Sequence, residues 1–349
     1  MRLDEFDYEL PEELIAQQPL EQRDASRMLV LNRASEKYED SRFELLPGYV
    51  RPGDVVVVNN TRVFPARLIG HREPSGGRVE LLLIHEIETG VWKTLARPAQ
   101  RLKPGSRVRF GDGSLKAEVL ESSAKGFRLL RFEAAATEDR SLDTLLDRHG
   151  ETPLPHYIRR PSGTSSEDSE RYQTVFAHEK GAIAAPTAGL HFTPAIISAL
   201  QARGAQVVEI TLHVGYGTFE PVRVDHVEQH RVASESFRVS EETAAVINES
   251  RARGGRIIAI GTTTTRALEA SANAEGSVVA GAGDADLTIT PGYKFRVTDG
   301  LLTNFHLPRS SLLLLVSAFA GPAFTLAAYR HAVAARYRFY SYGDCMFVM

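Results

Sequence analysis

The sequence predicts an α/β layered domain with a partly parallel sheet, into which a small all-β barrel domain is inserted. Between residues 54 and 133, apolar runs of four to eight residues alternate with Gly, Ser and Pro turns and show no helical period, which is typical of a barrel. After Pro155, strand and helix patterns alternate, which is typical of an α/β layer fold. The first 50 residues are too few for a domain of their own. We therefore assign residues 1–55 and 153–349 to the α/β domain and residues 56–152 to the barrel.

Residues that favour helix and strand ends give the elements in chain order. Proline and acids after Leu10 suit a helix start, and Ser or Thr before an apolar run suits an N-cap. The predicted barrel strands are Val55–Val58, Val79–Ile84, Val108–Phe110 and Phe127–Phe132; the predicted helices are a short one from Pro11, then Ser141–His149, Pro194–Gly204, Ser240–Gly254 and Thr265–Ala272; the predicted strands between the last helices are Gln206–Val214 and Arg256–Ile260.

The stretch from Leu312 to Tyr329 carries no charge and is nearly long enough to span a membrane. However, Gly321-Pro322 falls in its middle and Ser310-Ser311 is a good helix start. We therefore expect two buried helices with a break between them, the second running on to Tyr337.

Composition is that of a water-soluble globular enzyme or binding protein, with 43% hydrophobic and 24% charged residues and a net charge of −3. The single cysteine, Cys345, excludes an internal disulfide and a thiolate metal cluster. The amino terminus is acidic and lacks the apolar core of a signal peptide. We expect a cytoplasmic location.

Polar and glycine-rich loops follow the predicted strands. Thr262 and Thr263 follow a buried strand and open a helix, where free amides and hydroxyls could hold a carboxylate or ribose, although a plain N-cap is an equal reading. His213 ends another strand, and Gly215 and Gly217 after it would let backbone approach a ligand. Since ligands of open α/β sheets bind beyond the carboxyl ends of strands, we expect a pocket there.

Several common sites are not supported. The chain has no phosphate-binding G-x-x-x-x-G-K-[ST], dinucleotide G-x-G-x-x-G or G-x-S-x-G motif. His226 and His230 have metal-ligand spacing, but no third ligand is evident and a solvated face is the better interpretation. We therefore expect no metal and no cofactor.

Basic residues concentrate in the predicted barrel. Six Lys and Arg residues fall between Lys93 and Phe110 without one acid, so this module could follow a nucleic-acid backbone; a solvated face is an equally good interpretation. Arg159 and Arg160 form a further basic pair. The predicted phosphate-contacting residues are Arg97, Arg101, Lys103, Arg107, Arg109, Arg159 and Arg160.

The segments Ala185-Pro-Thr-Ala-Gly-Leu-His-Phe-Thr193 and Leu301-Leu-Thr-Asn-Phe-His-Leu-Pro308 resemble one family closely, the S-adenosylmethionine:tRNA ribosyltransferase-isomerases of queuosine biosynthesis. The resemblance runs from end to end of the chain. It implies an α/β domain with an inserted barrel. It also implies transfer and isomerisation of the ribosyl part of S-adenosylmethionine onto 7-aminomethyl-7-deazaguanine at the tRNA wobble position, giving epoxyqueuosine, adenine and methionine. The further matching segments are Arg23–Leu31, Asp54–Gly70, Gly150–Arg160, Glu170–Ala177, Thr211–Val222, Gly261–Glu269, Pro291–Gly321 and Tyr337–Met346.

The sequence departs from this family in three places. Asn60 stands where the family usually has Asp, Thr264 and Thr265 replace a usual Ser-Val, and the segment from Arg23 to Arg27 carries one extra residue. The Asn60 change weakens any role for that position as a general base.

The implied reaction needs a proton for the leaving adenine and removal of protons beside sulfur. Candidate acid–base residues are His191, His213, His306 and Asp299. Aromatic side chains could stack on adenine or hold the sulfonium. The candidate substrate-binding residues are Asn60, Arg62, Thr187, Gly189, Phe192, Gly215, Gly217, Thr218, Phe219, Thr262, Thr263, Arg266, Tyr293, Asn304 and Phe305.

Two other functions remain open from the residues alone. A non-catalytic RNA-binding protein would bind the RNA backbone through the barrel, and its α/β domain would be a scaffold. A methyltransferase would also use S-adenosylmethionine, but would release S-adenosylhomocysteine. The expected partners are the tRNA anticodon arm and S-adenosylmethionine, with no membrane, and the expected state is a monomer.

Overall fold

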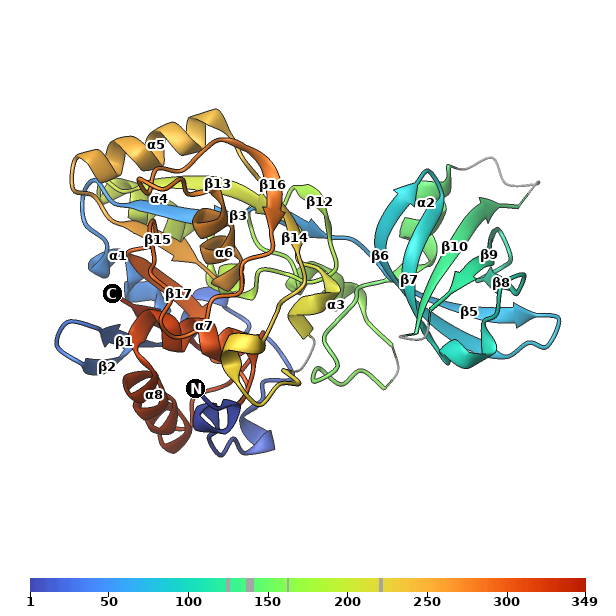
Figure 1. The fold of residues 1–349 in the computed structure, drawn as a ribbon, viewed down its shortest axis with the longest axis horizontal. Coiled ribbons are helices and arrows are strands. Elements are labelled where there is room, and N and C mark those ends of the chain that lie inside the picture. The colour runs from blue at the N-terminus through green and yellow to red at the C-terminus, as the bar shows by residue number, and fades with distance from the viewer. Residues whose placement is uncertain (124–125, 136–140, 162, 220–221) are drawn as a thin grey trace.

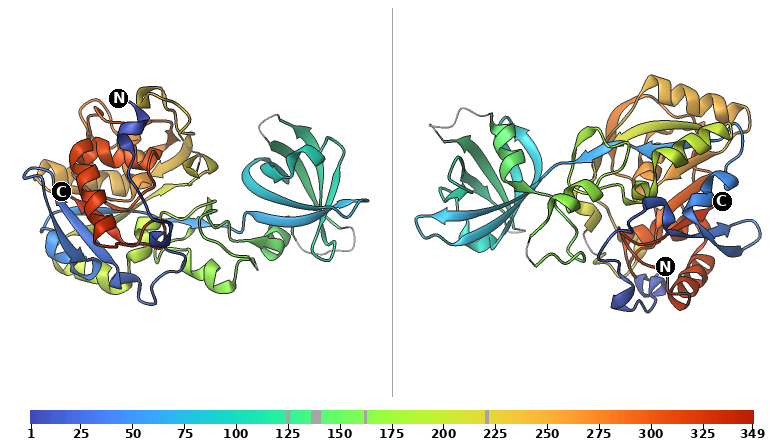
Figure 2. Two further views of the ribbon diagram at one scale, coloured as in Figure 1. Left: turned by 90° about the horizontal axis from the view of Figure 1, so that it is seen from below. Right: turned by 180° about the vertical axis from the view of Figure 1, so that it is seen from behind.

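The computed structural model describes residues 1–349 except 124–125, 136–140, 162 and 220–221, and gives no side-chain description for 218–219. It contains an α/β domain and a separate barrel, joined by connections near residues 64–67 and 151–165 (Figures 1 and 2). The expected fold class is confirmed.

One mixed sheet of nine strands organises the α/β domain. Its central strands are parallel: β13 pairs with β3, β3 with β15, and β15 with β17. In spatial order the strands are β16 (Gly281–Ala285), β14 (Glu235–Val239), β13 (Gln206–Leu212), β3 (Val55–Asn59), β15 (Ile257–Ile260), β17 (Gly300–Asn304), β18 (Cys345–Val348), β1 (Arg27–Asn32) and β2 (Lys37–Arg42).

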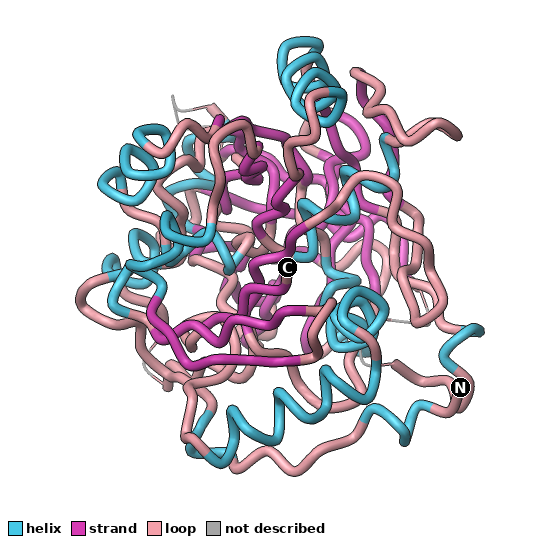
Figure 3. Tube along the Cα trace, turned by 90° about the vertical axis from the view of Figure 1, so that its left-hand side faces the viewer, coloured by secondary structure: helices cyan, strands magenta, loops and turns pink. Residues whose placement is uncertain are grey.

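Helices cover both faces of this sheet, as the end-on view in Figure 3 shows. Val57, Ala259 and Leu301 share one face by register, and that face packs against α5, α6, α7 and α8. The opposite face packs against α1 and α4. The ranges are α1 (Leu46–Tyr49), α4 (Pro194–Ala202), α5 (Glu241–Ala252), α6 (Thr262–Ser271), α7 (Ser311–Ala320) and α8 (Pro322–Ala334), with the short α3 (Ser166–Arg171) outside the layers.

The barrel is a closed ring of six antiparallel strands, because β5 pairs with both β6 and β8. Its interior is filled by apolar side chains. The strands in order are β5 (Arg67–Glu73), β6 (Arg78–Glu88), β7 (Val91–Arg97), β10 (Phe127–Ala134), β9 (Leu115–Ser122) and β8 (Arg107–Phe110), followed in the chain by α2 (Leu142–His149) and the two-residue β11 (Gly150–Glu151).

The predicted first boundary of the barrel, between residues 55 and 56, is wrong. Val55–Asn59 forms β3, the central parallel strand of the α/β sheet, and Thr61–Val63 forms β4, which pairs with β12 (Glu179–Ala182). The barrel begins only at β5. A fully apolar run of four valines suits a buried parallel strand as well as a barrel strand, so periodicity could not assign it to a domain.

Other differences are local. The segment after Pro11 forms only a 3₁₀ turn, Glu12–Leu14, and α6 begins at Thr262 rather than Thr265. The uncharged stretch forms α7 and α8, as expected, although α8 ends at Ala334. Among the described residues no single helix is long and apolar enough to cross a membrane. Taken together α7 and α8 meet the length and composition criteria, but they are bent by 115° at their break.

Candidate active site

Loops from the carboxyl ends of β15 and β17 surround a cavity of about 270 Å³, which we call the edge cavity. The loop before α4, with the 3₁₀ turn Thr187–His191, forms another wall. The polar or aromatic residues around it are His156, Tyr157, Tyr172, Thr187, Thr262, Thr263, Thr303, Asn304, Phe305, His306, Arg309, Ser310, Ser311, Tyr340 and Ser341. The parallel order β3-β15-β17 brings these loops together, as the strand-end argument predicts.

The amino terminus of α6 opens into the edge cavity. Gly261 caps it with φ of +92°, a conformation that glycine tolerates best, and no side chain satisfies the first amides. The Thr264 and Thr265 hydroxyls bond back to the carbonyls of Ile260 (2.7 Å) and Gly261 (3.1 Å). Thr263 Oγ1 is different: it is buried and has no hydrogen-bond partner. Free amides and this hydroxyl form a seat for an anion.

A second helix terminus faces the same space. Ser310, Ser311 and Leu312 line the cavity at the start of α7, where Ser310 Oγ accepts a hydrogen bond from Leu313 N. None of the described lining residues is an Asp or Glu. The positive ends of two helix dipoles face this cavity, and none of the described carboxylates lines it. The electrostatic potential there therefore favours a negatively charged group.

Asn304 connects the walls of the cavity. Its Oδ1 accepts a hydrogen bond from Thr187 Oγ1 at 3.0 Å, and its Nδ2 donates to the Tyr340 carbonyl at 3.2 Å. The same Nδ2 lies 3.2 Å from His191 Nε2. Thr187 and Asn304, both predicted substrate-binding residues, thus lie together with Thr262 and Thr263.

The two histidines nearest this cavity are buried. His191 is 4% exposed and its Nδ1 lies 2.8 Å from Ser26 Oγ; His306 is 6% exposed and its Nε2 lies 2.9 Å from Thr303 Oγ1. Burial lowers the pKa of His191 to about 4 and that of His306 to about 3. Both rings are therefore neutral at pH 7 and weak bases, which suits positioning better than proton transfer.

Phe192 and Phe305, two of the aromatic residues predicted to bind substrate, have fully buried side chains. Phe192 is fully buried and its ring packs against Phe43 and Phe176. Phe305 borders the cavity, but its side chain is fully buried against Tyr329 and other rings. The stacking role expected of both is therefore wrong, because these rings are core.

Close packing against neighbouring side chains explains the glycine at position 189. A Cβ at this position would lie 2.7 Å from the ring of Phe176 and 2.9 Å from Thr174 Cγ2. A glycine here lets the turn before α4 lie against those side chains, and it does not line the edge cavity among the described residues.

Asp299 lies at the opposite end of β17 from the edge cavity. It precedes β17, its backbone amide donates to the Ile257 carbonyl, and its Oδ2 accepts from the Ile257 amide at 2.9 Å. Asn304, at the cavity, is five residues further along the strand, about 16 Å at 3.3 Å per residue. The structure therefore contradicts a catalytic position for Asp299 in this cavity.

Arg266 and Tyr293 bind to carboxylate side chains of the protein itself. Arg266 forms a buried ion pair with Glu235, whose other oxygen accepts from Gly215 N at 2.8 Å. Tyr293 donates to Glu269 at 3.2 Å. Neither lines the edge cavity, so direct substrate contact there is contradicted for both.

His213, Gly215 and Gly217 line a larger space of about 750 Å³ between the two domains, which we call the interdomain cleft. His213 Nδ1 lies 2.8 Å from Thr61 Oγ1, and burial lowers the pKa of this histidine. A Cβ at Gly217 would lie 2.3 Å from Ala233 Cβ, so this glycine permits a close approach of two loops. The side chains of Thr218 and Phe219 lie outside the described part of the chain.

Asn60 and Arg62 lie away from both spaces. Asn60 is buried, donates to Glu209 Oε2 at 3.1 Å and accepts from Thr211 at 2.8 Å, in a groove on the far side of β13. Arg62 is exposed on β4. Their predicted contact with substrate in the edge cavity is contradicted.

The basic run is exposed on the barrel, as a phosphate-contacting surface requires. Arg97 donates to His156 Nε2 at 3.0 Å across the two domains. Arg159 is exposed and pairs with Glu12. Arg160 is half-buried and its guanidinium pairs with buried Asp168 at 2.8 Å, so the phosphate contact predicted for it is wrong. The exposed members are Arg97, Arg101, Lys103, Arg107 and Arg109.

Three aromatic residues of the edge cavity were missed by the sequence reasoning. Tyr157 and Tyr340 pack with ring centres 3.9 Å apart and planes tilted by 51°, and Tyr157 shares a short hydrogen bond (2.5 Å) with Ser341. Tyr172 lines the wall beside them. Each lies in or beside a segment that matches the family, but no charge or glycine pattern singled it out.

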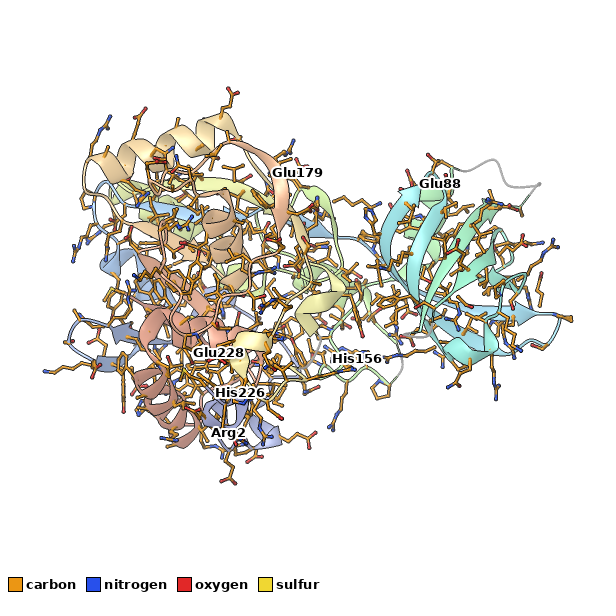
Figure 4. All side chains as sticks on the ribbon, viewed as in Figure 1. Arg2, Glu88, His156, Glu179, His226 and Glu228 are labelled. Atoms are coloured by element: carbon orange, nitrogen blue, oxygen red, sulfur yellow. The ribbon has the colours of Figure 1, made fainter. Side chains whose placement is uncertain are left out.

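His156 was also missed as a site residue. It is exposed and lines the edge cavity, and it lies between the two domains in Figure 4. Among the described residues no group of three or more His, Cys, Asp or Glu could hold a metal ion. The expectation of a metal-free enzyme stays a prediction.

The family model described as "Queuosine biosynthesis protein" matches residues 3–348. The chain belongs to this family. It is 50% identical over 349 residues to the S-adenosylmethionine:tRNA ribosyltransferase-isomerase of Symbiobacterium thermophilum and 48% identical to that of Natranaerobius thermophilus, covering 100% of this chain in both cases and 100% and 99% of those proteins.

A crystal structure of S-adenosylmethionine tRNA ribosyltransferase from Thermotoga maritima is similar along the whole length. It is 39% identical, it covers 99% of this chain and 100% of that chain, and the TM-score is 0.56. The expected family is thus confirmed.

Proposed function

We propose that the edge cavity is where S-adenosylmethionine binds and reacts. The chain is an S-adenosylmethionine:tRNA ribosyltransferase-isomerase of queuosine biosynthesis, as its full-length relatives are named. It moves the ribosyl part of S-adenosylmethionine to the 7-aminomethyl-7-deazaguanine base of tRNA and isomerises it, with release of adenine and methionine. No cofactor is needed for this chemistry, because S-adenosylmethionine is itself consumed.

One observation carries the placement: the buried Thr263 hydroxyl has no partner and lies at the uncapped start of α6 in a cavity without carboxylates. The α-carboxylate of the methionyl group is the anionic part of S-adenosylmethionine. Amides at a helix start and a free hydroxyl are suited to bind it. The rest of the cavity surface is largely apolar, which suits the flat adenine ring.

The test combines a protein change with a ligand change. Thr263→Val removes the hydroxyl at nearly constant volume, and decarboxylated S-adenosylmethionine lacks the carboxylate. We expect the variant to bind S-adenosylmethionine roughly tenfold more weakly, the effect of one hydrogen bond to a charged group. It should bind the decarboxylated analogue as the unchanged protein does. Equal losses for both ligands would contradict a carboxylate at Thr263. Thr298→Val, another buried hydroxyl without a partner but outside this cavity, is the matched control.

His156 is the histidine that we propose for proton transfer. Unlike His191 and His306 it is exposed, and it borders the edge cavity. Arg97 can only donate, so Nε2 of His156 accepts and its Nδ1 carries the proton. Burial, followed by the Arg97 charge, lowers the pKa of His156, which keeps the ring neutral near pH 7. Nε2 accepts a proton from the substrate when the hydrogen bond from Arg97 opens.

The exposed arginines and lysine of the barrel form the proposed surface for the anticodon arm. One of them, Arg97, lines a cleft of about 300 Å³ together with Arg67, Arg159 and Arg160, which we call the basic cleft. His156 lines both the basic cleft and the edge cavity, so RNA held there would lie beside the reacting ribose. We further propose a monomer acting in the cytoplasm, where its tRNA substrate is found.

A further inference from the structure

Partly exposed aromatic side chains line the interdomain cleft. Trp92 and Phe127 come from the barrel, and Tyr216 comes from the loop after β13; all three are half-buried and line it. The Phe127 and Tyr216 rings meet edge to face with centres 6.2 Å apart, and Trp92 packs against Phe64 with centres 5.8 Å apart. Partly exposed rings around one open space are a surface on which a flat base can stack.

Carboxylates dominate the charge of this cleft. Glu86, Asp143, Asp147, Glu235 and Asp284 line it. Asp147 is neutralised by Lys180 at 2.7 Å, and Glu235 pairs with Arg266. Asp143 on α2 and Asp284 on β16 are exposed and form no ion pair with any residue that the structure describes. Glu86 on β6 is likewise exposed and without an ion pair among the described residues, so two carboxylates of the barrel domain and one of the α/β domain border the cleft unpaired.

One ring in this cleft already holds a cation. Lys93 Nζ lies 4.9 Å from the centre of the Phe127 ring. One face of this ring is therefore occupied by an ammonium group, which the ring attracts. Lys93 is the cation of the cleft that lacks a carboxylate partner among the described residues, so the unpaired acids Asp143 and Asp284 outnumber it.

The basic cleft shows the opposite chemistry. Its lining carries four arginines and one acid, Glu80, which pairs with Arg67 at 3.0 Å. Arg159 and Arg160 pair with Glu12 and Asp168, so Arg97 is the arginine of this lining that has no ion pair among the described residues. Tyr216 lines both clefts, so they lie on either side of this residue. A nucleotide that spanned the two would place phosphate on the basic side and its base on the aromatic, acidic side.

The position of the interdomain cleft suits the reaction. Val214 lines both this cleft and the edge cavity, so only the residues around Val214 separate a ligand in one from a ligand in the other. The nucleophile of the reaction is the aminomethyl group of the base, an ammonium ion before it loses its proton. A site for this base must be flat, must tolerate positive charge and must adjoin the ribose of S-adenosylmethionine.

We propose that the interdomain cleft is the binding site for the cationic 7-aminomethyl-7-deazaguanine base, which stacks on Phe127 beside the perpendicular ring of Tyr216 while Asp143 and Asp284 attract its ammonium group. The inference rests on the function proposed above. These four residues would allow the protein to distinguish the aminomethyl base from bases that lack the amine.

The test measures binding of two anticodon stem-loop RNAs that differ only at the wobble position, one with 7-aminomethyl- and one with 7-methyl-7-deazaguanine. We expect the unchanged protein to bind the aminomethyl RNA roughly tenfold more tightly, because ion pairs at a partly exposed site are modest. Asp143→Asn with Asp284→Asn should reduce this preference to about twofold or less, with little change for the methyl RNA. Asn is tolerated in the first turn of α2 and at an exposed strand position, so both sites should remain folded.

The matched control is Glu133→Gln, an exposed carboxylate on β10 of the barrel that does not line the described clefts, which should keep the full preference. Phe127→Leu should weaken both RNAs about equally, because stacking does not depend on the amine. An unchanged preference in the double Asp variant, or equal loss of both RNAs, overturns the inference. Affinity for S-adenosylmethionine, measured without RNA, should stay the same in every variant; it tests the edge cavity separately, so failure of the one site is distinguishable from failure of the other.

Discussion

Asn304 donates a hydrogen bond from Nδ2 to Nε2 of His191 over 3.2 Å, which fixes this histidine as the tautomer that carries its proton on Nδ1. That proton then points to Ser26 Oγ, 2.8 Å away. The ring is thus fixed on both sides and joins the loop before α4 to the end of β17. His191 holds the geometry of the edge cavity rather than exchanging a proton with the substrate.

This burial predicts an acid-sensitive stability. The folded-state pKa of His191 is about 4 and that of His306 about 3, both below the unfolded value near 6.5. The unfolded chain therefore binds more protons between these values, so the stabilisation is complete above about pH 6.5 and is lost as pH falls toward 4 and 3. We expect the urea midpoint to fall from pH 7 to pH 4.5. His306→Gln should flatten this dependence, and an equally steep profile in that variant would contradict the role of burial.

His156→Gln should reduce turnover by about 10²–10⁴-fold, the usual contribution of a general acid or base. The affinity for S-adenosylmethionine should change little, and the acidic limb of the pH–rate profile should disappear. His226→Gln is the matched control, because this exposed histidine does not line the edge cavity. Normal turnover in the His156 variant would place proton transfer on another group.

The barrel surface should set the salt dependence of RNA binding. Arg107 and Arg109 are exposed on β8, and replacing both with glutamine should raise the Michaelis constant for tRNA without changing the affinity for S-adenosylmethionine. Each lost phosphate contact should reduce the slope of log affinity against log salt by about 0.7–0.9. An unchanged slope would mean that the two arginines are only a solvated face and that the anticodon arm docks elsewhere.

Chelator treatment should leave activity unchanged. The chain has one cysteine, buried Cys345, and burial raises its thiol pKa, so it is a poor thiolate ligand at neutral pH. The measurement is release of adenine and methionine after dialysis against EDTA, with the metal content recorded in parallel. Activity that is lost with a stoichiometric metal and restored by adding it back would show that the prediction is wrong.

The sequence by itself determined the family, the two-domain fold class and most of the helices after residue 140. Those features depend on local order: cap residues, strand-length apolar runs and two long motifs. It also indicated a pocket beyond the carboxyl ends of the strands, with Thr262 and His213 beside it. The structure places Thr262 at the edge cavity and His213 in the interdomain cleft.

Only the tertiary structure decided which side chains face a ligand. Phe192 and Phe305 have the same local character as a stacking residue, but the packing of α4 and α8 buries them. Asp299 directly precedes the short strand β17 and Asn304 ends it, and the direction of this strand in the sheet places Asn304 at the cavity and Asp299 at the opposite end. His156 gained its position from the approach of the barrel, whose Arg97 lies 59 residues away in sequence. Burial and strand direction are properties of the assembled sheet, so no local pattern could have given them.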